Sequence, residues 1–251
     1  MKEESLNISL LSVVEFLNNA ASVNFGSDIE EKFHVGHPRF KSFSQMRGKI
    51  LDIGSGDGGM GQLINWPISQ SDKSLVGCDI KDRSTLPPGY SEWISGGWEM
   101  ISSEQKYGGI LAIHLIEHLE SWAQMLECAI NALEPGKFIY VEWPVEESTA
   151  WPTASEIWRI FQKSNPNFPE QLLTTFNFYD DNTHTSHPPK ISDVISASLG
   201  IEIVESGRIL MPHVGRSLVA KGLRDQSISN VTMGTWAHFG FAQFIFGRKT
   251  K

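Results

Sequence analysis

Hydrophobic residues change their spacing repeatedly along the chain. Apolar residues at spacings of three and four predict four amphipathic helices. These are residues 6–17, 121–133, 153–161 and 191–199. Short apolar runs predict strands buried on both faces. These are residues 49–53, 74–79, 107–115, 138–141 and 201–204, and a looser alternation over 239–246 predicts a terminal strand. Alternation of such strands with helices predicts an α/β fold, with a mostly parallel sheet and helices on both faces.

The remaining segments lack a clear period. The stretch 28–43 is mixed and polar and predicts a loop or cap, and 60–64 predicts a short helix. Thr153-Ala154-Ser155-Glu156 is a capping box that begins the helix over 153–161. Three tryptophans, Trp143, Trp151 and Trp158, surround an insertion near 145–180. They predict either a lid over a ligand or a small additional core.

A glycine pattern follows the first strand directly. Gly54-x-Gly56-x-Gly58 lies between a predicted strand and a predicted helix. Glycines let the backbone turn tightly and approach a ligand closely, and the helix N-terminus offers N–H groups to an anion. Asp79 ends the second strand, where an acid accepts hydrogen bonds from ribose hydroxyls. The pattern fits both the pyrophosphate of a dinucleotide and the carboxylate of an amino acid.

Further motifs follow in order along the chain. Lys49 to Gly58, Tyr107 to Leu119 with Glu117-His118, Leu133 to Lys137, and Phe178 to His184 together resemble the class I S-adenosylmethionine-dependent methyltransferases over roughly residues 45–247. Phe178 to His184 resembles a subgroup that includes many glycan and small-molecule methyltransferases. The resemblance implies a Rossmann-like seven-stranded sheet with an antiparallel last strand and an N-terminal helical cap.

The resemblance also implies roles for individual residues. Asp52 and the loop residues Gly54, Ser55 and Gly56 would hold the methionine end of S-adenosylmethionine. Asp79 would bind the ribose hydroxyls, and Ile80 would lie against the adenine. His114, at the carboxyl end of the fourth strand, is also expected to contact the cofactor.

Two segments depart from the family pattern. Gly97-Trp98-Glu99 stands where the family often has Gly-Asp contacting the adenine amine, so the acid is either absent or displaced to Glu99. Trp98 is the alternative contact, which would cover the adenine by stacking. The Phe-Asp that opens the family's fourth strand is Tyr107-Gly108 here.

Two histidines are the candidate catalytic residues. Methyl transfer to a hydroxyl releases a proton, and histidine is the side chain suited to accept it near neutral pH. His114 ends the fourth strand of the resembling motif, beside the expected cofactor site, and His184 closes the Phe178 segment. Asp180 and Asp181 are adjacent on an extended segment and point opposite ways, so no metal site is predicted.

Composition narrows the alternatives. The chain has 251 residues, 40% of them hydrophobic and 20% charged, which is typical of a folded globular protein. A net charge of −8 disfavours binding to nucleic acid. The two cysteines and the acidic start predict a cytoplasmic protein, and no stretch predicts a membrane span.

Together these patterns predict one methyltransferase domain over 1–251. Its parts are an N-terminal cap (1–47), a cofactor-binding half (48–143), an insertion or lid (144–190) and a substrate-side half (191–251). The expected activity is O-methylation of a small molecule or a sugar or glycan intermediate. The alternatives are a non-catalytic methyltransferase-like binding or partner protein and, less favoured, an NAD(P)-dependent oxidoreductase. The sequence does not indicate an oligomeric state.

Overall fold

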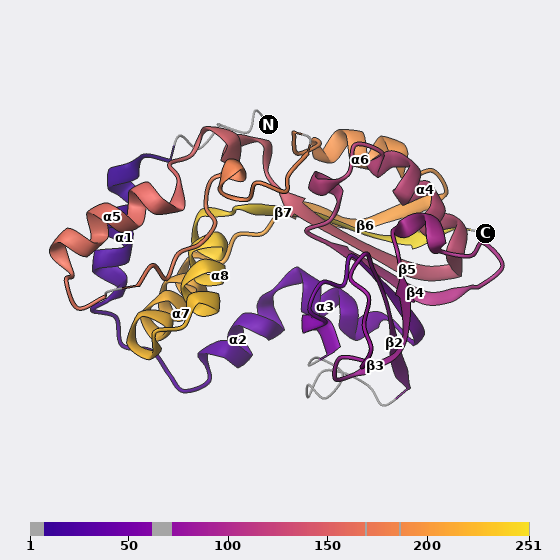
Figure 1. Ribbon diagram of the computed structural model, residues 1–251, viewed down its shortest axis with the longest axis horizontal. Coiled ribbons are helices and arrows are strands. Elements are labelled where there is room, and N and C mark those ends of the chain that lie inside the picture. The colour runs from indigo at the N-terminus through magenta and orange to yellow at the C-terminus, as the bar shows by residue number, and fades with distance from the viewer. Residues whose placement is uncertain (1–7, 62–71, 169, 186, 251) are drawn as a thin grey trace. The chain divides into compact units, whose positions relative to one another are not determined.

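The protein is described here from a computed structural model that covers residues 8–61, 72–168, 170–185 and 187–250 (Figure 1). The chain forms two compact units, each built from three segments. The sheet unit comprises Pro38–Trp143, Thr185–Gly207 and Gln243–Lys251. The helical unit comprises Met1–His37, Pro144–His184 and Arg208–Ala242. The organisation into one methyltransferase domain stays a prediction.

The sheet unit contains seven strands. They are β1 (Gly48–Ile53), β2 (Lys73–Asp79), β3 (Tyr90–Ser95), β4 (Tyr107–Ile113), β5 (Leu133–Pro144), β6 (Ile201–Arg208) and β7 (Ala242–Lys249). Their order in the sheet is β3-β2-β1-β4-β5-β7-β6. The pairs from β3 to β5 are parallel, and the last strand is antiparallel. The predicted Rossmann-like fold is confirmed.

Strand β1 occupies the point where the strand order reverses, between β2 and β4. Ligands of open parallel sheets bind outside the carboxyl ends of the strands at this point. Residues 50–53 of β1 are all buried, which explains the continuous apolar run of the sequence. Figure 1 shows α4 (Trp122–Ala132) and α6 (Ile191–Ala197) on one side of the sheet and α3 (Pro38–Gln45) on the other.

Three local predictions differ from the structure. Strand β3 was not predicted, because its Ser91 and Glu92 are exposed and break the apolar pattern. The stretch 28–43 was predicted as a loop or cap, but it contains α2 (Ile29–Gly36) and the start of α3, which bury only a few apolar residues each. The helix predicted over 121–133 and the strand predicted over 138–141 leave Glu134-Pro135-Gly136 between them. That segment lies inside β5 instead, where the register with β4 shifts.

The helical unit has its own hydrophobic core. Its helices are α1 (Leu10–Ala20), α2, η4 (Glu146–Ala150), α5 (Ala154–Ser164), η5 (Phe178–Asp180), α7 (Pro212–Asp225) and α8 (Ile228–Phe239). Trp151 and Trp158 are buried in this core. Trp143 is buried in the core of the sheet unit. All three tryptophans are therefore part of a hydrophobic core. Trp151 and Trp158 lie in the additional core that was one of the two predicted alternatives, and Trp143 lies in the core of the sheet.

Helices α7 and α8 were not predicted from the sequence. The two helices contact each other extensively. A Cβ on Gly234 would lie 2.7 Å from the carbonyl oxygen of Gly215, so only glycine permits this approach. Helix α8 also includes Phe239, so the terminal strand begins at Ala242, later than predicted.

The predicted helix over 60–64 falls mostly outside the described residues, which stop at 61 before resuming at 72. In the part of the chain that the structure covers, no helix has the length and apolar character needed to cross a membrane.

Candidate functional site

The loop after β1 has the backbone that its glycines allow. Gly54, Gly56 and Gly58 have φ values of +70°, +52° and +79°, in the left-handed region that side chains with a Cβ rarely adopt. The N–H of Gly54 donates to the carbonyl of Cys78 at 2.8 Å, which ties the loop to the end of β2. The loop is therefore fixed at the carboxyl ends of two central strands.

The glycines of this loop serve different purposes. A Cβ on Gly58 would lie 2.5 Å from the Cβ of Pro87, so Gly58 makes room for the protein itself. A Cβ on Gly56 or on Gly59 would meet no atom of the described residues within 4 Å. Gly56 is therefore the left-handed glycine of the loop that borders open space, as a residue that lets a ligand approach the backbone would.

Asp79 joins the loop to the end of β2. Its Oδ2 accepts a hydrogen bond from the N–H of Gly56 at 2.7 Å, and its Oδ1 accepts one from the N–H of Lys81 at 2.9 Å. Two backbone donors orient the carboxylate, and each oxygen keeps a lone pair for a further donor. The next residue, Ile80, exposes 82% of its surface. The Asp79 carboxylate is suited to accept hydrogen bonds from ribose hydroxyls, and the exposed side chain of Ile80 is suited to pack against a base.

Two other predicted cofactor residues are less accessible. Trp98 begins η2 (Trp98–Met100) and is half-buried, packed against the core of the sheet unit. The hydroxyl of Ser55 is buried, lies 2.9 Å from where a Cβ of Gly77 would be, and has no hydrogen-bond partner among the residues that the structure describes. Their predicted contacts with the cofactor stay predictions.

Asp52 lies beneath the glycine loop and is buried. The hydroxyl of Tyr90, at the start of β3, donates a hydrogen bond to its Oδ2. Burial raises the pKa of Asp52 to about 7, although the Tyr90 hydrogen bond opposes that rise. Asp52 is thus an inner carboxyl group whose charge changes near neutral pH.

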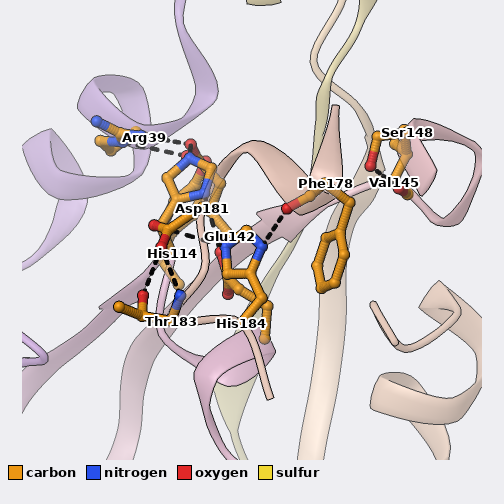
Figure 2. A network of polar contacts seen from close by, with 11 residues as sticks. Arg39, His114, Glu142, Val145, Ser148, Phe178, Asp181, Thr183 and His184 are labelled. Atoms are coloured by element: carbon orange, nitrogen blue, oxygen red, sulfur yellow. Dashed lines mark hydrogen bonds and ion pairs between the residues drawn. The ribbon is translucent and has the colours of Figure 1, made fainter. Parts of the chain in front are cut away.

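His114 lies at the carboxyl end of β4 between two buried glutamates. Its Nδ1 is 3.1 Å from Oε1 of Glu117, and its Nε2 is 3.2 Å from Oε1 of Glu142. Glu142 also accepts hydrogen bonds from the guanidinium of Arg39 (Figure 2). The hydroxyl of Tyr140 donates a further hydrogen bond to Glu142. The five residues form a buried polar network in the sheet unit.

The network favours a charged His114. Burial by itself lowers the pKa of His114, but the hydrogen bonds and charges of the two glutamates outweigh it and raise the pKa to about 9. At neutral pH the ring is therefore an imidazolium, with both nitrogens protonated. A protonated ring cannot accept the proton of a methyl acceptor, so this environment suits a positioning role. The predicted role of His114 as a base stays a prediction.

His184 has a different environment in the helical unit. Its Nδ1 is 2.6 Å from the carbonyl oxygen of Phe178, and its ring stacks on the Phe178 ring at 4.1 Å (Figure 2). A carbonyl only accepts, so Nδ1 carries the proton in the neutral ring and Nε2 carries the lone pair. Its Nε2 lies 3.9 Å from Oδ2 of Asp181, and the side chain is only 5% exposed. The predicted catalytic role of His184 stays a prediction.

The acids of the Phe178 segment organise the backbone. Asp180 accepts hydrogen bonds from the N–H groups of Ala154, Phe176 and Asn177 at 2.7–3.1 Å. Asp181 accepts from the N–H and the hydroxyl of Thr183 at 2.9 and 2.6 Å. These contacts give both acids a structural role.

Four residues around these sites were missed by sequence reasoning. They are Arg39, Tyr90, Glu142 and Arg83, whose guanidinium donates a hydrogen bond to the carbonyl oxygen of Gly56. Arg39 lies in the stretch predicted as a loop, and Tyr90 lies on the strand that was not predicted. The sequence did offer one indication for Glu142, since a carboxylate that directly follows the apolar run 138–141 is expected to be buried and to need a partner.

Comparison with known proteins identifies the class. A family profile described as a methyltransferase domain matches residues 28–184. The chain therefore belongs to this family, within the class I S-adenosylmethionine-dependent methyltransferases. No curated protein sequence gives a significant match.

Solved structures agree on the fold. The plantazolicin methyltransferase BpumL, in complex with a desmethyl plantazolicin analogue and S-adenosylhomocysteine, is 16% identical and has a TM-score of 0.52. The match covers 96% of this chain and 90% of BpumL. A protein from Listeria monocytogenes assigned to the S-adenosylmethionine-dependent methyltransferases is 13% identical, with a TM-score of 0.50 and coverage of 90% and 99%. At these identities the likeness concerns the fold alone.

Proposed function

We propose that this chain transfers a methyl group from S-adenosylmethionine to an oxygen atom of a small molecule or a sugar intermediate. The observation that best supports S-adenosylmethionine as the cofactor is the hydrogen bond between Gly56 and Asp79. The left-handed glycine borders open space, and its N–H orients a carboxylate at the end of the neighbouring strand. Membership of the methyltransferase-domain family supports the same reading.

The residues at the loop fit the parts of this cofactor. The backbone of Gly54, Ser55 and Gly56 would bind the methionine end. The remaining lone pairs of Asp79 would accept the ribose hydroxyls, and the exposed side chain of Ile80 would lie against the adenine. When bound, S-adenosylmethionine supplies an electrophilic methyl group, so the protein's task is mainly to orient the acceptor.

His184 is the proposed base. An acceptor hydroxyl must lose its proton during transfer, and the carbonyl of Phe178 favours the neutral tautomer of His184 in which Nε2 carries the lone pair. Asp181, whose Oδ2 lies 3.9 Å from Nε2, would stabilise the ring once it is protonated. His114, as an imidazolium, would instead hold the carboxylates of Glu117 and Glu142 in place. This assignment separates the two candidate histidines into one base and one positioning residue.

Calorimetry with S-adenosylhomocysteine tests the cofactor. We expect binding by the unmodified protein, and a loss of at least tenfold in Gly56→Arg and in Asp79→Ala. Gly136→Arg is the matched control, because Gly136 also has a left-handed φ of +75° and no described atom within 4 Å of its Cβ position, and it lies near the amino end of β5. Binding of NADH with no binding of S-adenosylhomocysteine would favour the oxidoreductase alternative.

Transfer of radiolabelled methyl groups to a panel of sugars and phenols tests the chemistry. We expect His184→Gln to reduce kcat about 100-fold with little change in affinity for S-adenosylhomocysteine. Equal kcat in His184→Gln and the unmodified protein would contradict the role of base. Cofactor binding with no transfer to any acceptor would favour the non-catalytic alternative.

A further inference from the structure

Arg83 contacts the cofactor loop from the segment that follows β2. Its Nη2 donates a hydrogen bond to the carbonyl oxygen of Gly56 at 2.7 Å and lies 2.9 Å from Oδ1 of Asp57. Gly56 is also held through its N–H, which donates to Asp79. Both peptide groups of the one glycine are thus fixed by residues 79–83.

Arg83 is itself held in position. Its guanidinium lies over the ring of Trp93 at 5.4 Å from the centroid. The indole Nε1 of Trp93 donates to the carbonyl of Lys81 at 3.0 Å, so Trp93 fixes the segment that carries Arg83. A Cβ on Gly77 would lie 2.4 Å from the Trp93 ring, which shows that β2 leaves room for this indole. Arg83 therefore has a defined place between Trp93 and the loop.

The contact with Gly56 is the one that matters. Asp57 exposes 87% of its side chain and also pairs with Lys81, so its ion pair with Arg83 is screened by water. The carbonyl of Gly56 is part-buried and accepts a charge-assisted hydrogen bond. A glycine has the widest choice of backbone conformations, so it gains the most from being held at both ends.

We propose that Arg83 is a positioning residue that holds Gly56 in its left-handed conformation before the cofactor binds. This inference rests on the proposed function, because it concerns the loop assigned there to the methionine end of S-adenosylmethionine. Arg83 would act through the loop backbone and would raise cofactor affinity by reducing the conformational freedom lost on binding.

Two measurements test the proposal. Calorimetry with S-adenosylhomocysteine is expected to show a Kd about tenfold higher for Arg83→Ala, the loss typical of one charge-assisted hydrogen bond. Arg83→Lys, which keeps a cation and one donor, is expected to recover part of that affinity. Hydrogen exchange in the protein without cofactor is expected to be faster over residues 54–58 in Arg83→Ala than in the unmodified protein.

Two further variants separate this role from general effects. Lys81→Ala removes a cation of the same charge that also pairs with Asp57, so a loss caused by charge alone would be equal in the two variants. We expect the loss in Arg83→Ala to be at least fivefold larger. Lys49→Ala, which removes an exposed ion pair with Glu92, is expected to match the unmodified protein.

The outcomes distinguish this inference from the proposed function. If the unmodified protein does not bind S-adenosylhomocysteine, the proposed function fails, and hydrogen exchange still tests whether Arg83 holds the loop. If it binds, and Arg83→Ala matches it in both affinity and exchange, Arg83 is not a positioning residue and the proposed function stands. Should Arg83→Ala not fold, Arg83→Lys and Arg83→Gln are compared by the same two measurements, and unchanged values in both would overturn the inference.

Discussion

His114 has a left-handed backbone, with φ of +49°, directly after β4. This conformation costs a residue with a Cβ about 1–2 kcal/mol. It directs the ring between Glu117 and Glu142, where both nitrogens have an acidic partner. Breaking a buried pair of this kind leaves a carboxylate without compensation, which is expensive. The strained backbone and the network therefore depend on each other.

The raised pKa of His114 predicts a pH dependence of stability. The pKa moves from 6.5 to about 9, so the stabilisation is complete below about pH 6.5 and is lost as the pH rises through 9. The difference corresponds to at most about 3 kcal/mol. His114→Asn tolerates the left-handed backbone but does not titrate. Denaturant unfolding between pH 6 and 9.5 should show a decline in the unmodified protein that the variant lacks, and parallel profiles would contradict the assignment.

Sequence and structure agree best on residues whose roles are local. Gly56 and Asp79 were predicted as parts of one site, and the structure joins them by a hydrogen bond. Arg39 and Glu142 are 103 residues apart, and only the folded sheet unit brings them together. The charge of His114 depends on that long-range contact, so the sequence alone favoured a base where the structure favours an imidazolium.

At the scale of elements, the start of α5 depends on a distant residue. Thr153 and Glu156 form the predicted capping box, and Asp180 adds two further hydrogen bonds to the N–H of Ala154. The same carboxylate closes the turn at Phe176 and Asn177. Asp180 thus joins helix α5 to the turn η5 within the helical unit.

Removing Asp180 should therefore destabilise the protein. We expect Asp180→Ala to lower the free energy of unfolding by about 2–4 kcal/mol, since several backbone donors lose one acceptor. Thermal unfolding measures the change. Asp193→Ala, at an exposed position of α6, is the control and should differ from the unmodified protein by less than about 0.5 kcal/mol. Equal melting temperatures of the two variants would refute the capping role.

The α7–α8 contact gives a second prediction at this scale. Gly234→Ala would place a Cβ 2.8 Å from a side-chain carbon of Val219 and 2.7 Å from the carbonyl oxygen of Gly215. We expect a loss of roughly 1–3 kcal/mol, the cost typical of overpacking, despite the better helix propensity of alanine. Ser229→Ala, at an exposed position of α8, should leave the melting temperature nearly unchanged. A melting temperature of Gly234→Ala at or above that of Ser229→Ala would show that the helices can separate without cost.

The elements that were predicted correctly have a regular pattern of hydrophobic residues, because each face of the element has a uniform environment. β1, β2 and β4 are buried on both faces, and α4 has one apolar face, so their sequences reveal them. β3 lies at the edge of the sheet with exposed polar residues, so its pattern is weak. Helices α7 and α8 carry glycines at their contact, which lowers helix propensity although the contact requires them.

At the scale of the whole molecule, each of the two units has a separate core. The residues of the proposed cofactor site all belong to the sheet unit. A ligand that binds only the folded state should therefore slow hydrogen exchange mainly in the sheet unit.

Hydrogen exchange measures this prediction. With S-adenosylhomocysteine at 100 times its Kd, the folded state should gain about 2.7 kcal/mol. We expect slower exchange at the ends of β1, β2 and β4 in particular. NADH at the same concentration is the control and should leave these segments unchanged. Protection that omits the sheet unit would contradict the location of the site.

The inner carboxyl group of Asp52 has a thermodynamic consequence. Its pKa of about 7 makes its charge sensitive to its surroundings near neutral pH, and it lies two residues before the loop that would receive the cofactor. A bound sulfonium would favour the ionised form, so association would release a fraction of a proton to the solvent. The heat of S-adenosylmethionine binding at pH 7 would then vary with the ionisation enthalpy of the buffer, and Asp52→Asn should remove that variation. Binding heats independent of the buffer would show that Asp52 keeps its protonation state throughout.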